Sequence, residues 1–167
     1  MKKIEVPKID FINFLIRAKI NTWAGEGKKI RKSDYSRNYY YKEGSFEYMD
    51  QYFGNLMDGG REVVFFDGKP VWIMCYHGGV LRDYNDQSAE IFSFLRKALQ
   101  SPPKEFPVRG PTSYTNDKFT YKNSWKGDLY YFWGDELILR NDNGLKVYRR
   151  AYVGGEIRDK EYFVLFI

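Results

Sequence analysis

Two stretches of the chain place aromatic rings around one short polar residue at alternate positions, which is the spacing of one side of a β-strand. The first stretch carries Phe46, Tyr48, Asp50 and Tyr52. The second carries Phe119, Tyr121, Asn123 and Trp125. If these faces meet, they form an aromatic-walled cavity with one carboxyl group, which is the usual form of a small-molecule pocket. The candidate ligand-binding residues are therefore Tyr48, Asp50, Trp72, Tyr76, Tyr121 and Trp125.

Asp50 is the only acid on the two aromatic faces. Strand alternation places it on the same side as Tyr48 and Tyr52, so we expect its carboxyl group to be largely buried. Two roles stay open. Either hydrogen bonds within the fold satisfy the carboxyl group and Asp50 is structural, or one oxygen is free in a cleft and contacts a ligand. Because the matching position holds Asn123, the two stretches are expected to have specialised.

Residues for enzyme chemistry form a weaker pattern. Glu62 and Glu136 occupy equivalent positions, and paired carboxylates do acid–base work when burial separates their pKa values. We expect them instead to be structural, pairing with a nearby cation or closing a strand end. Cys75 and His77 stand about 6.6 Å apart on a strand, too far for a nucleophile and its base. A non-enzymatic protein is favoured, with a hydrolase or transferase that uses a buried carboxylate, Asp50 or Glu62, as an alternative.

Metal and cofactor motifs do not occur in the sequence. One cysteine and one histidine leave only carboxylates as further ligands, so no zinc centre is expected. The chain has no nucleophile elbow, Walker loop or dinucleotide-binding fingerprint, and we expect no cofactor.

The segment K28-K-I-R-K-S-D-Y-S-R-N-Y-Y-Y-K42 holds six cations and one acid, and its charge of +5 equals the net charge of the whole chain. Cations interleaved with tyrosines can bind phosphates and stack on bases, so nucleic acid is an alternative partner. The candidate residues for it are Lys28, Lys29, Arg31, Lys32 and Arg37. The other interpretation is a solvated loop, whose residues Lys28–Lys32 are exposed or poorly ordered.

Composition indicates one domain that spans residues 1–167, with 43% hydrophobic and 19% aromatic residues. A single cysteine excludes an internal disulfide, so we expect a cytoplasmic protein. No run of about 18 apolar residues occurs, so no membrane partner is expected. The sequence does not indicate an oligomeric state.

Apolar residues at helical spacing predict a first helix that has Asp10 as its N-cap and ends near residues 22–27. A second helix is predicted over Ala89–Leu99, which is followed by consecutive prolines. After each helix the apolar period changes to two, which predicts strands. F66-D-G-K69 and N141-D-N-G144 supply residues typical of hairpin turns.

A frame of valine, an aromatic residue, tyrosine and two glycines occurs at residues 71–79 and again at 147–155. Other matching positions are offset by 73 to 76 residues, which we interpret as an internal repeat of residues 10–81 and 88–157. Each copy is predicted to be a helix followed by an antiparallel meander of three strands, and residues 104–118 a linker. One copy leaves a sheet face or edge uncovered, so the two must cover each other. We therefore predict an α+β fold with pseudo-two-fold symmetry.

Three segments combine tyrosine, glycine and charged residues in a specific order: Y41-K-E-G-S-F-E-Y-M-D-Q-Y-F-G54, G60-R-E-V-V-F-F-D-G-K-P-V-W-I-M-C-Y-H-G78 and Val108-Arg109-Gly110-Pro111. They resemble an uncharacterised prokaryotic domain of unknown function, over about Phe11 to Ile157. Members of that family often lie C-terminal to XRE-type helix-turn-helix regulator domains. The resemblance implies a sensor-like or ligand-binding domain and carries no assigned activity.

Overall fold

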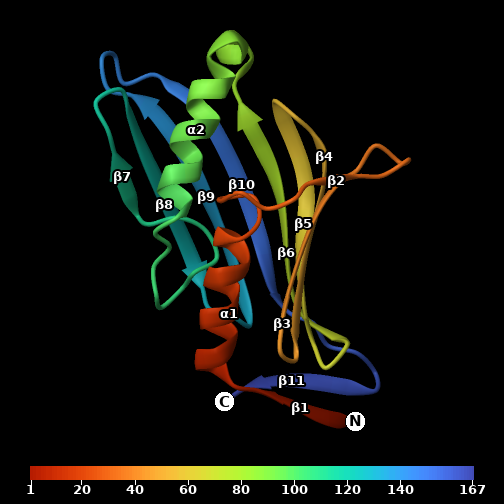
Figure 1. The fold of residues 1–167 in the computed structure, drawn as a ribbon. Coiled ribbons are helices and arrows are strands. Elements are labelled where there is room, and N and C mark those ends of the chain that lie inside the picture. The colour runs from red at the N-terminus through yellow and green to blue at the C-terminus, as the bar shows by residue number, and fades with distance from the viewer.

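A computed structural model describes residues 1–167 as one large antiparallel sheet, a small parallel sheet and two α-helices (Figure 1). The strands of the large sheet, in spatial order, are β2 (Ile30–Arg31), β3 (Arg37–Glu43), β4 (Phe46–Gly54), β5 (Met57–Phe66), β6 (Lys69–Val80), β10 (Lys146–Glu156), β9 (Tyr131–Arg140), β8 (Phe119–Gly127) and β7 (Ser113–Thr115). The small sheet pairs β1 (Lys2–Val6) in parallel with β11 (Tyr162–Phe166), which places the first and last strands of the chain side by side. The helices are α1 (Lys8–Ile20) and α2 (Ser88–Leu99), with a short 3-10 helix, η1 (Arg82–Gln87), before α2. The predicted α+β class is confirmed.

Both α-helices lie on the same, concave side of the curved sheet (Figure 1). Their buried residues recur at helical spacing, and the stripe of α1 consists of Phe11, Phe14, Leu15, Ala18 and Lys19. In the strands, buried residues recur at every second position. In β4, for example, buried and half-buried residues alternate along most of the strand. The sheet face toward the helices is therefore the core face. Lys19 is the exception in the α1 stripe, because it carries a charge into that core.

The first helix begins earlier than the sequence predicted. Its N-cap is Pro7 rather than Asp10, with φ −60° and ψ 113°. The proline ring fixes φ at a value that suits the start of a helix. Asp10 instead lies in the first turn, where its negative charge interacts favourably with the positive end of the helix dipole. The second helix was predicted within one residue of its observed bounds.

Each half of the chain contains a helix followed by an antiparallel meander, and the last strands of the two meanders, β6 and β10, pair with each other. The predicted turn between β5 and β6 is confirmed, because Asp67 and Gly68 both have positive φ, 48° and 74°. The prediction of three strands per half was wrong. The tyrosine-rich segment forms β3, the linker 104–118 contributes β7, and β1 and β11 form the separate parallel pair.

Candidate functional site

A buried cavity lies between the end of α1, the core face of the sheet and the segment that follows α2. Its lining residues are Lys19, Thr22, Trp23, Ala24, Tyr48, Asp50, Tyr52, Asp58, Glu62, Tyr76, Leu99, Val108, Arg109 and Arg150. Its volume is about 30 Å³, which is room for about two water molecules. Both halves of the chain contribute to it, and its polar residues are at most 8% exposed.

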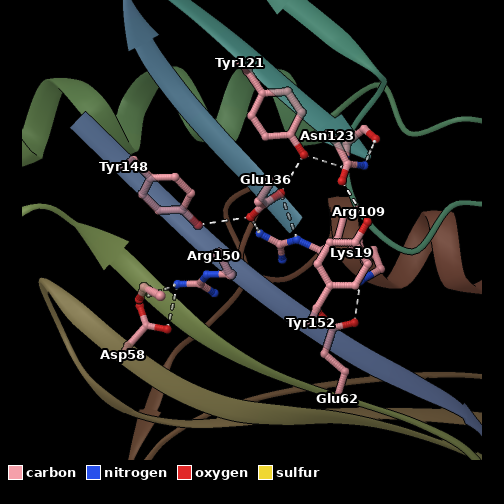
Figure 2. A network of polar contacts seen from close by, with 12 residues as sticks. Lys19, Asp58, Glu62, Arg109, Tyr121, Asn123, Glu136, Tyr148, Arg150 and Tyr152 are labelled. Atoms are coloured by element: carbon pink, nitrogen blue, oxygen red, sulfur yellow. Dashed lines mark hydrogen bonds and ion pairs between the residues drawn. The ribbon is translucent and has the colours of Figure 1, made fainter. Parts of the chain in front are cut away.

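On the side of the second half, Glu136 of β9 is the centre of a hydrogen-bond network (Figure 2). The Arg109 guanidinium donates to both carboxylate oxygens, once from Nε at 3.2 Å. The hydroxyl groups of Tyr121 and Tyr148 donate to the same carboxylate at 2.5 and 3.0 Å. Burial would raise the pKa of Glu136, but the Arg109 guanidinium holds it below its ordinary value. Glu136 is thus an ionised carboxylate with every oxygen satisfied, as the predicted pairing with a cation requires.

On the side of the first half, Glu62 of β5 pairs with Lys19 of α1 (Figure 2). Burial lowers the pKa of the Lys19 ammonium group, and the charge of Glu62 opposes that shift. Burial and the charge of Glu62 also raise the pKa of Tyr48 well above its ordinary value, so its hydroxyl group stays protonated. The predicted pairing of Glu62 with a nearby cation is likewise confirmed.

A third buried ion pair lines the cavity. Arg150 Nη2 donates to Asp58 Oδ1 at 2.7 Å (Figure 2). The Arg150 guanidinium also lies 4.7 Å from the centre of the Tyr76 ring. Burial raises the pKa of Asp58, and the charge of Arg150 limits the shift. The cavity therefore contains cations and carboxylates that neutralise one another in pairs.

Asp50 differs from every other charged group in the cavity because it has no cation of its own. It is 4% exposed, as predicted, and Tyr76 donates its hydroxyl hydrogen to Oδ1 at 2.6 Å. No other hydrogen bond reaches the carboxyl group. Burial and the neighbouring charge of Glu62 raise the pKa of Asp50 to about 7. At neutral pH this carboxyl group exists in both protonation states.

Asn123, which the sequence pattern aligns with Asp50, is fully satisfied. Asn123 accepts a hydrogen bond from Tyr152 at 2.7 Å, which matches the bond from Tyr76 to Asp50. Asn123 Nδ2 also donates to the carbonyl oxygen of Gly110 at 2.8 Å. Nothing equivalent to Gly110 reaches Asp50, so the free oxygen is specific to the first half.

The structure brings together only some of the predicted site residues. Tyr48, Asp50 and Tyr76 line the cavity, and Tyr121 lies in the adjoining network around Glu136. Trp72 is fully buried in the core, where its ring stacks on Phe132 at 5.6 Å. Trp125 is half-buried and stacks on Phe106 at 5.1 Å. Neither tryptophan lines the cavity.

Four charged residues of the site were not assigned to it by the sequence analysis: Lys19, Asp58, Arg109 and Arg150. A signal existed for Lys19, which falls on the apolar stripe of a helix, where a cation needs a buried partner. Arg109 was missed because its segment, residues 104–118, is rich in proline and turn-forming residues and was predicted to be a linker.

The basic segment lies away from the cavity, at the β2–β3 edge of the sheet. Lys28 to Lys32 are exposed, as predicted, and Lys32 Nζ lies 5.5 Å from the centre of the Tyr40 ring. Arg37 differs, because it donates to the carbonyl oxygen of Gly54 at 2.6 Å. A shallow groove beside it is lined by Arg31, Lys32, Tyr35, Arg37, Phe53 and Gly54.

Cys75 and His77 both lie on the exposed face of β6, away from the cavity. No group of three or more histidine, cysteine, aspartate or glutamate side chains is placed to hold a metal ion. No helix is long and apolar enough to span a membrane.

The fold and the site together define an α+β domain with a small cavity between its two halves, lined by buried charged residues. Residues 50–157, more than half of the chain, match the model of a domain of unknown function, DUF5680, and the chain belongs to this family. This confirms the expected relation to an uncharacterised domain family. No curated protein and no solved structure matches the chain.

Proposed function

We propose that the protein is a non-enzymatic, sensor-like domain that binds a small polar molecule in the cavity around Asp50. One observation carries this proposal: Asp50 is buried in the cavity wall, has no cation as a partner and has one oxygen without a hydrogen bond. A buried polar group is normally satisfied, and a fold that leaves one free beside a cavity is suited to receive a ligand there. The neighbouring ion pairs supply a fixed, pre-organised wall.

The proposal includes the internal duplication of residues 10–81 and 88–157. It is supported by the shared order of helix and meander and by the matching tyrosine contacts of Asp50 and Asn123. In this view the second copy keeps a satisfied asparagine for stability, and the first copy keeps an aspartate for binding. A role as the sensing part of a regulator, which the resemblance to domains that follow helix-turn-helix regulators suggests, is part of the same proposal.

A ligand screen with Asp50→Asn tests the binding function. A ligand at about 100 times its Kd stabilises the folded protein by about 2.7 kcal/mol, or roughly 5–10 °C in Tm. We expect small polar compounds to raise the Tm of the wild type, and Asp50→Asn, which copies Asn123, to fold normally and lose that shift.

The matched control is Asp135→Asn, which removes one carboxylate from an exposed position on the same sheet and should keep the shift. A ligand that shifts the wild type and Asp50→Asn equally would place binding elsewhere. A compound that binds and is converted to product only when Asp50 is present would support the alternative of an enzyme that uses this carboxylate.

A second candidate function is binding of single-stranded nucleic acid at the β2–β3 edge. The observation that favours it is the exposure of aromatic rings among exposed cations: Tyr35 is 87% and Phe53 48% exposed, and both line the groove with Arg31. Rings and cations in one groove can stack on bases and bind phosphates.

Replacing Lys28, Lys29, Arg31 and Lys32 with glutamine tests this candidate. We expect weaker binding of an oligothymidine, with the slope of log K against log salt reduced by about 3. Fluorescence anisotropy at several salt concentrations measures both quantities. Glutamine at four other exposed lysines, Lys104, Lys122, Lys126 and Lys160, is the control for lost charge. Equal losses in the two variants would show only a general effect of net charge.

A further inference from the structure

We propose that the ligand of the Asp50 cavity is a small monocation that carries N–H donors, such as an ammonium ion or a short primary amine. This inference rests on the proposed function and names the chemical class that the cavity selects. The charge balance, the free acceptor and the size of the site support it.

The charged groups around the cavity include one more carboxyl group than cations, so one further positive charge would balance them. The three cations pair one to one with three carboxylates, as Lys19 with Glu62, Arg109 with Glu136 and Arg150 with Asp58. Asp50 is the remaining carboxyl group. When it is protonated the buried network is neutral, and when it is ionised the network carries one uncompensated negative charge. A buried charge without a partner is costly, so ionised Asp50 favours a monocation. An anion would find no unpaired cation.

Around Asp50 the free groups accept hydrogen bonds, whereas the buried donor of the cavity wall that has no partner is Nε of Arg150, whose Nη2 is paired with Asp58. One carboxyl oxygen of Asp50 accepts no hydrogen bond. Tyr48 and Tyr52 line the same cavity, and their hydroxyl oxygens are further acceptors. A primary ammonium group has three donors and suits such a site, because a hydrogen bond between two charged groups is the strongest kind available to it. A quaternary ammonium ion has the charge without the donors.

The size of the cavity limits the ligand. About 30 Å³ holds about two water molecules, which fits an ammonium ion or methylammonium. The second half provides a comparison, since there Asn123 donates its own N–H to Gly110 and needs no ligand. In the first half the donor must come from outside, either as a proton on Asp50 or as a ligand N–H.

A proton and the amine therefore compete for one carboxyl group. The charged and titratable side chains around Asp50 come from α1, from five strands and from the segment after α2: Lys19, Tyr39, Tyr48, Tyr52, Asp58, Glu62, Tyr76, Arg150 and Arg109. Most of them are already fixed by one another, whereas Asp50 changes charge near neutral pH with its pKa of about 7. Binding of a monocation at pH 7 should release about half a proton per ligand.

Isothermal titration with methylammonium chloride, at constant ionic strength, tests the inference. At pH 8, above the pKa of Asp50, we expect saturable binding to the wild type and binding at least about tenfold weaker to Asp50→Asn. Titrations at pH 7 in buffers of different ionisation enthalpy count the released protons. Tetramethylammonium chloride, acetamide and sodium formate test charge without donors, donors without charge, and an anion.

Equal binding of methylammonium by Asp50→Asn, no binding by the wild type, or equal binding of tetramethylammonium would each overturn the amine class. The binding function survives such a result if acetamide, formate or another screened compound binds the wild type and not Asp50→Asn. If no compound distinguishes the wild type from Asp50→Asn, both proposals fail. Asp135→Asn again controls for the loss of one carboxylate.

Discussion

Replacing Arg109 with methionine is expected to lower the free energy of unfolding by about 3–5 kcal/mol. The side chain of Glu136 is fully buried, and Arg109 is the cation that donates to both of its oxygens. Without the guanidinium the carboxylate has only the hydroxyl groups of Tyr121 and Tyr148, which cannot neutralise it. Urea denaturation of the wild type and Arg109→Met at neutral pH measures the difference.

The double variant Arg109→Met with Glu136→Gln is the control, because it removes both charges. We expect it to recover at least about 1 kcal/mol of the loss. The pH dependence gives a second check. In the wild type the pKa of Glu136 is lowered, so its contribution is present above the unfolded pKa and is lost as the pH falls. In Arg109→Met, burial, the largest influence, is opposed only by the charge of Arg150 and the hydrogen bond from Tyr121, so that pKa is raised and the deficit should shrink as the pH falls. A deficit that is the same at every pH would mean that lost packing, rather than the unpaired charge, is responsible.

The strands and α2 could be predicted because their signals are local. Alternation from Phe46 and from Phe119 marks β4 and β8, and both strands begin at those residues. The edge strands were harder, because β2 and β7 are two and three residues long and exposed, so they carry almost no periodic pattern. The small β1–β11 sheet depends on pairing between the two ends of the chain, which no local pattern reveals.

The candidate site was predictable only in part for a related reason. Alternation on β4 predicts that Asp50 is buried, and the structure agrees. Which cation reaches which acid depends on the packing of distant elements, such as Lys19 on α1 against Glu62 on β5. Asp50 has a free oxygen because those pairs use all three cations of the cavity. It is a property of the whole network and of no single motif.

Ionisation of Asp50 is expected to have the second large effect on the free energy of unfolding. It destabilises the fold as the pH rises, whereas an ion-paired structural carboxylate stabilises it. Its pKa is raised from 3.8 to about 7, so between these values the folded state binds more protons than the unfolded state. Stability therefore falls as the pH rises through this window, by about 2–4 kcal/mol between pH 4 and pH 8. Ionising Asp50 is a cost that the fold carries in the absence of a ligand.

Asp50→Asn should remove that cost. The amide can accept the hydrogen bond of Tyr76 as Asn123 accepts that of Tyr152, and it has no charge to desolvate. We expect the variant to match the wild type near pH 4 and to exceed its stability by about 2–4 kcal/mol at pH 8, measured by urea denaturation across the pH range. A variant that is less stable than the wild type at pH 8 would make Asp50 a structural group and remove the basis of the binding proposal. A carboxyl group that destabilises its own fold at neutral pH is instead expected where function, rather than stability, requires the charge.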